Sequence, residues 1–196
     1  EKLTCIGQKS VPVTYIRQGS FIEFDAKKYF DDLTGVLSAL MAEHPGEVSQ
    51  IVFTGQAESL ICLDKEGEPL LNAISWMDER SAAECEILEK QFSSRQYHRI
   101  TGQQAVLPTW PATKILWLKG NRPELFRKVA TYVLLKDYIV YRLTDRMCGD
   151  MSIATFTFYF DIYGKCYWKQ MLDAIGITQE QLPPLVEPCS VIGNLT

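Results

Sequence analysis

The sequence lacks the features that would place the protein in a membrane or on a nucleic acid. No apolar run approaches the roughly 18 residues needed to cross a bilayer, and residues 1–4 carry no signal-peptide pattern. Lys and Arg are spread along the chain, often beside acids, and the net charge is −4. Nucleic-acid-binding domains usually concentrate basic residues on one face. The sequence therefore predicts no membrane partner and no nucleic-acid partner.

The familiar catalytic and phosphate-binding motifs are also absent. The sequence has no G-x-x-x-x-G-K-[ST] loop, no G-x-G-x-x-G and no G-x-S-x-G. It has two histidines: His44 stands beside Pro45 at a predicted helix end, and His98 stands in a polar stretch between arginines. Both positions favour a solvated imidazole over a catalytic one. A Ser/His/Asp triad therefore has little support in this sequence.

The six cysteines form no C-x-x-C pair, and their spacings are wide and irregular. Without a targeting segment, we expect reduced, mostly buried thiols in a cytoplasmic protein. The alternative is three disulfides in a secreted domain. A zinc site has less support, because neither histidine lies near a cysteine pair. No metal site is predicted. The cysteines are Cys5, Cys62, Cys85, Cys148, Cys166 and Cys189.

Length and composition are those of one folded domain covering residues 1–196. The chain is 46% hydrophobic and 22% charged, which is ordinary for a globular domain with a sizeable core. It starts without Met, and its last residues, 191–196, resemble the start of another strand. We therefore expect a fragment of a longer protein.

Hydrophobic patterning predicts an α/β fold with a mixed sheet and flanking helices. Short β-rich runs bounded by turn residues predict strands at 4–13, 21–24, 51–53, 60–63, 73–76, 132–135 and 155–160. Asp25 is a suitable N-cap for an amphipathic helix that starts at Ala26 and ends before Pro45. Further helices are predicted at 81–92, 93–101, 112–119, 123–128, 136–143 and 168–174.

Polar side chains follow two of these predicted strands, in segments 54–58 and 76–80. Ligands in α/β folds usually bind at strand ends, because the sheet fixes the backbone and the loops carry polar groups. Carboxylates and amides can bind sugar hydroxyls, and an indole can stack on a carbon skeleton. The sequence therefore predicts a pocket for a polyhydroxylated small molecule, lined by Gln56, Glu58, Trp76, Asp78 and Arg80.

Simpler interpretations of the same residues stay open. Trp76 can belong to the core, Asp78 can cap the helix that follows with Arg80 as its ion-pair partner, and Glu58 can be solvated. A hydrolase that uses Glu58 and Asp78 as a carboxylate pair is a further alternative.

A series of motifs runs through the chain in a fixed order. T-G-Q-A-E-S-L, L-D-K-E-G-E-P-L and A-I-S-W-M-D-E-R-S come first, and K-I-L-W begins at Lys114. K-D-Y with a following L-T begins at Lys136, D-M-S-I-A begins at Asp150, and L-P and I-G close the series. In order and spacing, this set resembles the first domain of the FGGY family of carbohydrate kinases over nearly the whole chain.

The resemblance implies an actin-like, ribonuclease-H-like fold. It also implies transfer of the γ-phosphoryl group of ATP, with Mg²⁺, to a hydroxyl of a small sugar or polyol. Residues on or beside the family's sugar-binding loops are Gln56, Glu58, Trp76, Asp78 and Arg80. The loop before the K-x-x-W helix adds a substrate contact near Thr109 or Trp110, and Trp110 is taken as the candidate.

The sequence departs from the family pattern in ways that concern the chemistry. The family's opening D-x-G-T phosphate loop is not found, its general-base Asp is expected beyond Thr196, and its nucleotide site lies mostly in a second domain. The resemblance therefore implies the sugar-binding half of a two-domain kinase, inactive alone, with ATP and Mg²⁺ bound only in the full-length protein. Its partners would be the substrate and that second domain, and a homodimer is left open. The alternative is a non-catalytic sugar-sensing or interaction module.

The acceptor class depends on two adjacent positions. Glycerol kinases resemble this chain in having Glu at position 58, but they place Arg where this chain has Ala57. Ketopentose kinases commonly have Met-His at positions 57 and 58. The acid at Glu58 therefore favours a polyol or an acyclic sugar.

Overall fold

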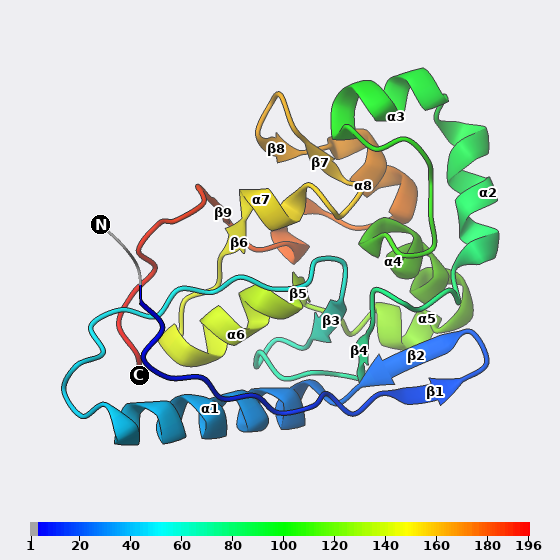
Figure 1. Ribbon diagram of the computed structural model, residues 1–196. Coiled ribbons are helices and arrows are strands. Elements are labelled where there is room, and N and C mark those ends of the chain that lie inside the picture. Colours follow the sequence, from blue (N-terminus) through cyan, green and yellow to red (C-terminus); the bar gives the residue numbers. More distant parts are fainter. Residues whose placement is uncertain (1–3) are drawn as a thin grey trace.

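The computed structural model describes residues 4–196 and has the predicted α/β architecture (Figure 1). Its main sheet has the strand order β1-β2-β4-β3-β5, and all of its pairings are antiparallel. Two smaller sheets pair β6 with β9 in parallel and β7 with β8 in antiparallel orientation. The strands are β1 Ile16–Gln18, β2 Phe21–Phe24, β3 Leu60–Leu63, β4 Ala73–Ile74, β5 Thr131–Leu134, β6 Gly149–Asp150, β7 Phe160–Asp161, β8 Cys166–Tyr167 and β9 Leu185–Val186.

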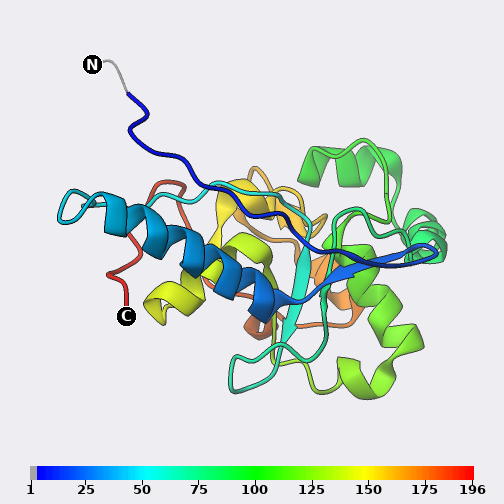
Figure 2. The same ribbon diagram turned by 60° about the horizontal axis from the view of Figure 1, so that its bottom comes forward.

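The helices cover both faces of the main sheet. In Figures 1 and 2, α1 and α6 lie on one side of β3, and α4 and α8 lie on the other. The helices are α1 Ala26–Glu43, α2 Ala82–Gln91, α3 Ser94–Thr101, α4 Pro111–Asn121, α5 Pro123–Phe126, α6 Leu135–Thr144, α7 Met151–Ala154 and α8 Lys169–Ile175, with a 3-10 turn at Gln179–Gln181. Across residues 4–196, no helix combines the length and the apolar character needed to span a bilayer.

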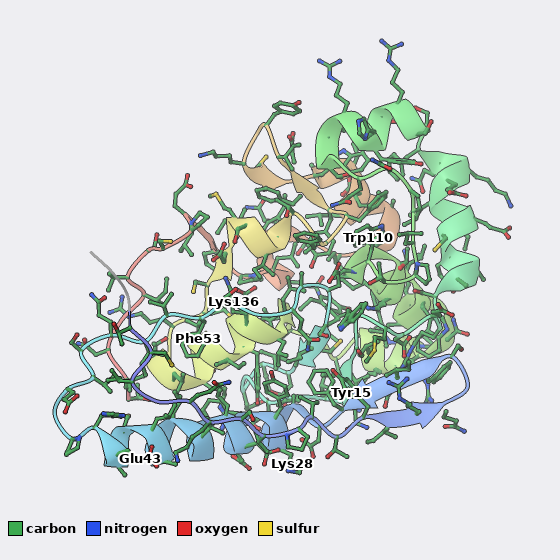
Figure 3. The ribbon with its side chains drawn as sticks, in the orientation of Figure 1. Tyr15, Lys28, Glu43, Phe53, Trp110 and Lys136 are labelled. Atoms are coloured by element: carbon green, nitrogen blue, oxygen red, sulfur yellow. The ribbon has the colours of Figure 1, made fainter. Side chains whose placement is uncertain are left out.

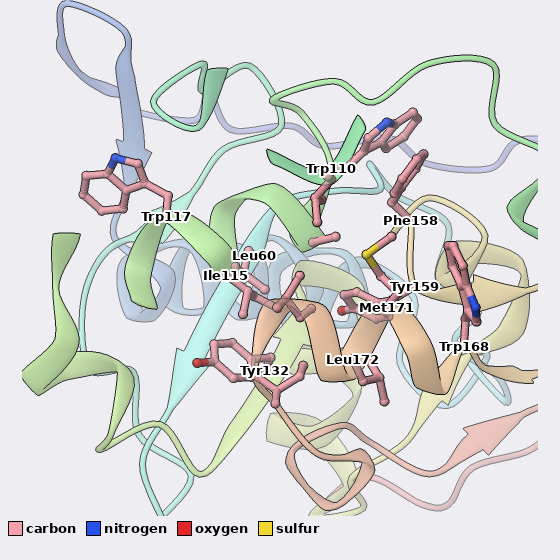
Figure 4. Packing of buried hydrophobic residues seen from close by; sticks show 14 of the residues in the cluster. Leu60, Trp110, Ile115, Trp117, Tyr132, Phe158, Tyr159, Trp168, Met171 and Leu172 are labelled. Carbon is pink, nitrogen blue, oxygen red and sulfur yellow. The ribbon is translucent and has the colours of Figure 1, made fainter. Parts of the chain in front are cut away.

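The central strand β3 belongs to two hydrophobic cores at once. All four of its residues are buried, and successive strand residues point to opposite faces of a sheet. Leu60 and Cys62 pack with side chains of α2, α4 and α8, whereas Ile61 and Leu63 pack with those of α1 and α6. Figure 4 shows the first of these cores, where Tyr132 of β5 and Leu60 of β3 meet α4 and α8. Burial on both faces explains why this strand is continuously apolar in sequence.

The longest helix, α1, confirms the prediction made from its periodicity. The Asp25 carboxylate caps it by accepting hydrogen bonds from the backbone N–H groups of Lys27 and Lys28, at 2.8 and 3.0 Å. Its apolar side chains, such as Tyr29 and Phe30, pack against the α6 face of the sheet. Most of the other predicted helices are also confirmed within a few residues of their predicted ends.

Three predicted strands are wrong, and a fourth is shorter than predicted. Residues 51–53 and 4–13 have no regular structure, because neither segment pairs with another strand in the described part of the chain. Val52 is 83% exposed. Residues 155–159 form turns and bends, and only residue 160 of the predicted strand belongs to β7; Phe158 is in the left-handed region at φ 68°, with its ring in the core. Strand β4 stops at Ile74, and residues 75 and 76 already belong to the loop that follows.

The cysteines are reduced, as predicted from the sequence. All six cysteines are free thiols, so the alternative of three disulfides is wrong. Cys62, Cys85 and Cys148 are buried, and the other three are exposed. The prediction that the thiols are mostly buried therefore holds for half of them.

Candidate functional site

The two polar loops predicted from the sequence meet at one edge of the main sheet. Leu60, the first residue of β3, pairs with Ile74 at the end of β4 and with Leu134 at the end of β5. The loop before β3 and the loop after β4 therefore leave the sheet side by side. A third segment, residues 105–110, leads to α4 at the same place and is tied to both loops by the hydrogen bonds described below. Residues 54–59, 75–80 and 105–110 are called here the three-loop cluster.

A buried lysine joins the three members of this cluster. The Lys114 Nζ donates hydrogen bonds to the backbone carbonyls of Glu58 at 3.3 Å, Ser75 at 2.8 Å and Thr109 at 2.7 Å. Lys114 lies in the first turns of α4 and is 0% exposed. Burial lowers its pKa to about 7, with the nearby carboxylates of Asp78 and Glu58 opposing that effect.

Two hydroxyl groups add further links between the same loops. The Thr109 Oγ1 donates to the carbonyl of Trp76 at 2.8 Å, and the backbone N–H of Trp76 donates to the Ser59 Oγ at 3.2 Å. Trp76 is therefore held through both its carbonyl and its N–H. The cluster is one connected unit.

Glu58 presents a carboxylate at this unit. Its backbone is in the left-handed region at φ 61°, which is uncommon for a residue other than Gly, Asn or Asp. Its side chain is partly buried, and this burial raises its pKa, while the charge of Lys114 opposes the rise. Strained backbone of this kind is often found at functional sites. Glu58 keeps part of its surface free to accept hydrogen bonds from a ligand.

Asp78 and Arg80, in contrast, face the protein interior. Asp78 is 0% exposed, and its oxygens accept from the Ile22 N–H at 2.6 Å and from the Arg80 backbone and guanidinium at 2.8–3.0 Å. Arg80 also pairs with Glu23 of β2 at 2.6 Å. Its guanidinium lies over the rings of Phe21, at 4.2 Å, and Trp117, at 5.1 Å. These two residues thus hold the second loop against β2 and α4. Other side chains form the exposed surface of the three-loop cluster.

The two tryptophans predicted for the site occupy different environments. Trp76 is 44% exposed, so its indole is available to a ligand. Trp110 is 6% exposed: its indole N–H donates to the carbonyl of Ala105 at 3.0 Å, and its ring stacks on Phe158 with centroids 6.1 Å apart (Figure 4). Trp110 therefore supports the third loop from within, and Thr109 is the neighbour with a partly exposed side chain. Gln56 is partly exposed in the first loop.

A second group of charges lies at the start of α6. Lys136 pairs with Asp150, which also caps α7 by accepting from the Ser152 N–H at 2.7 Å (Figure 3). Asp137 is buried beside them and accepts from the Asp150 N–H at 3.4 Å. Burial raises the pKa of Asp137 to about 7, against the effect of that hydrogen bond and of Lys136. These charges join α6 to the segment that carries the D-x-S-x-A motif.

Two further observations concern metal ligands and the groove beside α1. Across residues 4–196, no three His, Cys, Asp or Glu side chains gather closely enough to hold a metal ion. A groove of about 340 Å³ lies away from the three-loop cluster, between residues 9–16 and the first half of α1. It is lined mainly by apolar side chains and contains none of the predicted site residues. The predicted site residues therefore lie outside this groove.

Comparison with known proteins identifies the family. The chain matches the N-terminal domain of the FGGY family of carbohydrate kinases over residues 2–196.

The chain belongs to the FGGY family of carbohydrate kinases.

Individual members of the FGGY family resemble the chain in sequence and in fold. The chain is 32% identical over 174 residues to the xylulose kinase of Escherichia coli (strain K12), which covers 88% of this chain and 35% of that protein. It is 30% identical over 199 residues to the glycerol kinase of Halorhodospira halophila (strain DSM 244 / SL1), covering 96% and 39%. The solved structure of ligand-bound xylulose kinase from Lactobacillus acidophilus superposes with a TM-score of 0.88 at 28% identity, covering 96% of this chain and 38% of that one. The predicted actin-like fold is confirmed, and the chain spans less than two fifths of the length of these FGGY proteins.

Several residues that build the three-loop cluster were given no role in the sequence analysis. Lys114 was named only as the first residue of the K-x-x-W motif. A second signal was its position among the apolar residues of α4, where a charge must find buried partners. Ser59 and Glu23 gave none, because a serine before a strand and a glutamate within one are ordinary at the surface. Their roles follow from contacts with residues far away in the chain.

Proposed function

We propose that this chain, as one domain over residues 1–196, is the sugar-binding half of a kinase. The parent protein would transfer the γ-phosphoryl group of ATP to a hydroxyl of a small sugar or polyol. Membership of the FGGY family supports the reaction class. The observation that carries the assignment of the site is the three-loop cluster, where the partly exposed Glu58 and the exposed Trp76 lie on loops that Lys114 and Thr109 tie together.

Within this cluster we assign substrate contacts to the side chains that have free surface. Glu58 would accept hydrogen bonds from two hydroxyl groups, and Gln56 would both donate and accept. The Trp76 indole would cover the C–H side of the carbon skeleton. Thr109 replaces Trp110 as the contact from the third loop. Asp78 and Arg80 would not contact the substrate; they would fix the second loop, which carries Trp76.

The nucleotide and the metal are assigned to the rest of the parent protein. Within residues 4–196, no three His, Cys, Asp or Glu side chains form a group that could hold a metal ion by themselves, and Mg²⁺ in such enzymes is usually held largely by waters and substrate phosphates. When bound, Mg²⁺ neutralises charge on the phosphates of ATP. We assign ATP, Mg²⁺ and the general base to parts of the parent protein outside this chain, and predict that the isolated chain transfers no phosphate.

The acceptor is proposed to be a small polyol or an open-chain sugar. A carboxylate at position 58, as in glycerol kinases, suits adjacent hydroxyl groups that both donate to it. The named relatives include a xylulose kinase and a glycerol kinase, whose substrates are both small polyhydroxylated molecules. Ala57, where glycerol kinases place Arg, leaves more room beside Glu58, which favours an acceptor longer than glycerol.

The test is a screen of sugars and polyols with the parent protein, in which ADP release is measured. For the best acceptor, Glu58→Gln should raise KM about 10- to 100-fold, because a hydrogen bond to a charged group contributes about 1.5–3 kcal/mol. Glu66→Gln is the matched control, since Glu66 lies exposed in the β3–β4 turn. Its KM should stay at the wild-type value.

The outcomes separate this proposal from its alternatives. Sugar binding without ADP release from the parent protein would favour the non-catalytic sugar sensor. ATP-independent cleavage of a glycoside would favour a hydrolase, although the buried Asp78 is poorly placed to pair with Glu58. An unchanged KM in Glu58→Gln would overturn the site assignment and leave the family intact.

A further inference from the structure

Lys114 has an arrangement that is unusual for a buried lysine. An ammonium group has three N–H donors, and those of Lys114 have three backbone carbonyl oxygens within 3.3 Å. Buried charges are more often paired with a carboxylate. Here the charge is instead satisfied by the backbone, so its hydrogen bonds fix the paths of loops.

Each carbonyl belongs to a different member of the three-loop cluster: Glu58 in the first, Ser75 in the second and Thr109 in the third. The same three loops carry the proposed contacts to the substrate. The backbone of Trp76, in the second loop, bonds to Ser59 of the first loop and Thr109 of the third. Lys114 adds one donor group that reaches a carbonyl in each of the three loops. Without its ammonium, three carbonyls would lose a donor, and the two bonds of Trp76 would be left to hold the loops less firmly.

We propose that Lys114 is a positioning residue whose ammonium group fastens the three loops in the arrangement that binds the substrate. It would act through Glu58, Trp76 and Thr109 and would not touch the substrate itself. This inference rests on the proposed function for its consequence in catalysis, but the fastening of the loops does not.

The charge of Lys114 makes this fastening dependent on pH. Burial lowers its pKa to about 7, the carboxylates of Asp78 and Glu58 act in the opposite direction, and Arg80 adds to the lowering. These are the charged groups that face it from the first and second loops. A neutral amine has two N–H donors and cannot serve three carbonyls. The loops should therefore loosen as pH rises above about 7.

The first experiment measures KM for the acceptor in the parent protein between pH 6 and pH 9. The wild-type KM should rise at least 10-fold over this range, while kcat changes less than 3-fold. Lys114→Met should have a high KM that does not vary with pH, and the wild-type KM should approach it towards pH 9 without reaching it, because the neutral amine keeps two donors. Lys119→Met, on an exposed position of the same helix, should follow the wild type. A wild-type KM in Lys114→Met, or an unchanged slope with pH, would overturn the proposal.

The second experiment needs no activity and no substrate. In the 196-residue chain, amide hydrogen exchange should be at least 10-fold faster in Lys114→Met for the slowly exchanging amides of residues 54–59, 75–80 and 105–110. Amides of α1 and β5 should be unchanged. If Lys114→Met does not fold, the wild type still gives the answer: after correction for intrinsic exchange, protection of these loops should fall between pH 6 and pH 9. Constant protection would overturn the proposal.

The two experiments keep the inference and the proposed function distinct. Loosened loops in a parent protein that phosphorylates no sugar would overturn the function and leave the role of Lys114 standing. Phosphorylation of a sugar with unaltered loops in Lys114→Met would do the reverse.

Discussion

At the scale of single residues, Arg80 is the group that connects the second loop to the rest of the fold. Its side chain is 2% exposed and binds Asp78 in its own loop and Glu23 in β2. Its guanidinium also lies over the rings of Phe21 and Trp117, which themselves pack edge to face with centroids 5.5 Å apart. One cation therefore joins a strand, a loop and a helix.

Removal of this cation should strongly destabilise the domain. Arg80→Met would leave Asp78 and Glu23 without their positive partner, and breaking a buried pair in this way typically costs about 3–5 kcal/mol. The control is Arg127→Met, which breaks the ion pair with Glu124 at the surface and should cost less than about 1 kcal/mol. Urea unfolding of both variants measures the difference. Equal losses in the two variants would show that burial of Arg80 has no special weight.

The contrast between Glu58 and Asp78 shows what the sequence could predict at this scale. Both acids follow a strand of the predicted sheet, and both were predicted to bind the ligand. The structure places both in the three-loop cluster, but the Asp78 oxygens already accept hydrogen bonds from Ile22 and Arg80 of the same chain. Whether a carboxylate is already occupied depends on a strand more than 50 residues earlier, which no local pattern reveals.

At the scale of secondary-structure elements, two glycines lie in contrasting backbone conformations. Gly35 lies in the middle of α1, where an added Cβ would meet no atom within 4 Å. Gly67 lies in the turn after β3 at φ +81°, and an added Cβ there would overlap the hydroxyl of Tyr141. The carboxylate of Asp64 holds this turn by accepting from the N–H groups of Glu66 and Glu68 at 3.0 and 2.9 Å.

The same substitution should therefore have opposite effects at the two sites. Gly35→Ala should stabilise the protein by about 0.5–1 kcal/mol, because alanine restricts the unfolded chain and favours the helix. Gly67→Ala should destabilise it by about 1–3 kcal/mol, because a left-handed conformation is strained for alanine. Thermal unfolding of the two variants measures both effects. A gain in Gly67→Ala would contradict the turn geometry described here.

Elements defined by their own residues were predicted well, and elements defined by partners were not. The periodicity of α1 and the cap at Asp25 are local, so the sequence was sufficient. A strand also needs a neighbour, and residues 51–53 have β-rich composition without a pairing strand in the described part of the chain. Residues 155–160 are equally β-rich, yet all but the last form turns and bends that bring Phe158 into contact with Tyr97 and Trp110.

At the scale of the whole molecule, two buried ionisable groups have pKa values that approach 7 from opposite sides. Burial raises the pKa of Asp137, at the start of α6, from 3.8 to about 7. Burial lowers the pKa of Lys114, in α4, from 10.5 to about 7. Each group is thus harder to charge in the folded chain than in the unfolded chain. Stability depends on pH through this difference in bound protons.

The signs of the two contributions predict a minimum of stability near pH 7. Between pH 4 and 7 the folded chain retains a proton on Asp137 that the unfolded chain has lost, so the free energy of unfolding should fall by on the order of 3–4 kcal/mol. Between pH 7 and 9 the unfolded chain retains a proton on Lys114 that the folded chain has lost, so stability should rise again.

Urea unfolding from pH 4 to pH 9 measures this profile, and two variants separate its limbs. Asp137→Asn keeps an acceptor for the Asp150 N–H and should abolish the fall below pH 7. Lys114→Met should abolish the rise above pH 7 while leaving the acidic limb in place. A stability that rises above pH 7 is compatible with looser loops. Stability rises because the folded chain no longer holds a buried charge, whereas residues 54–59 loosen because Lys114 has lost a hydrogen-bond donor. A profile with its maximum at pH 7 would show that neither group is as strongly desolvated as its position between the packed helices and the sheet implies.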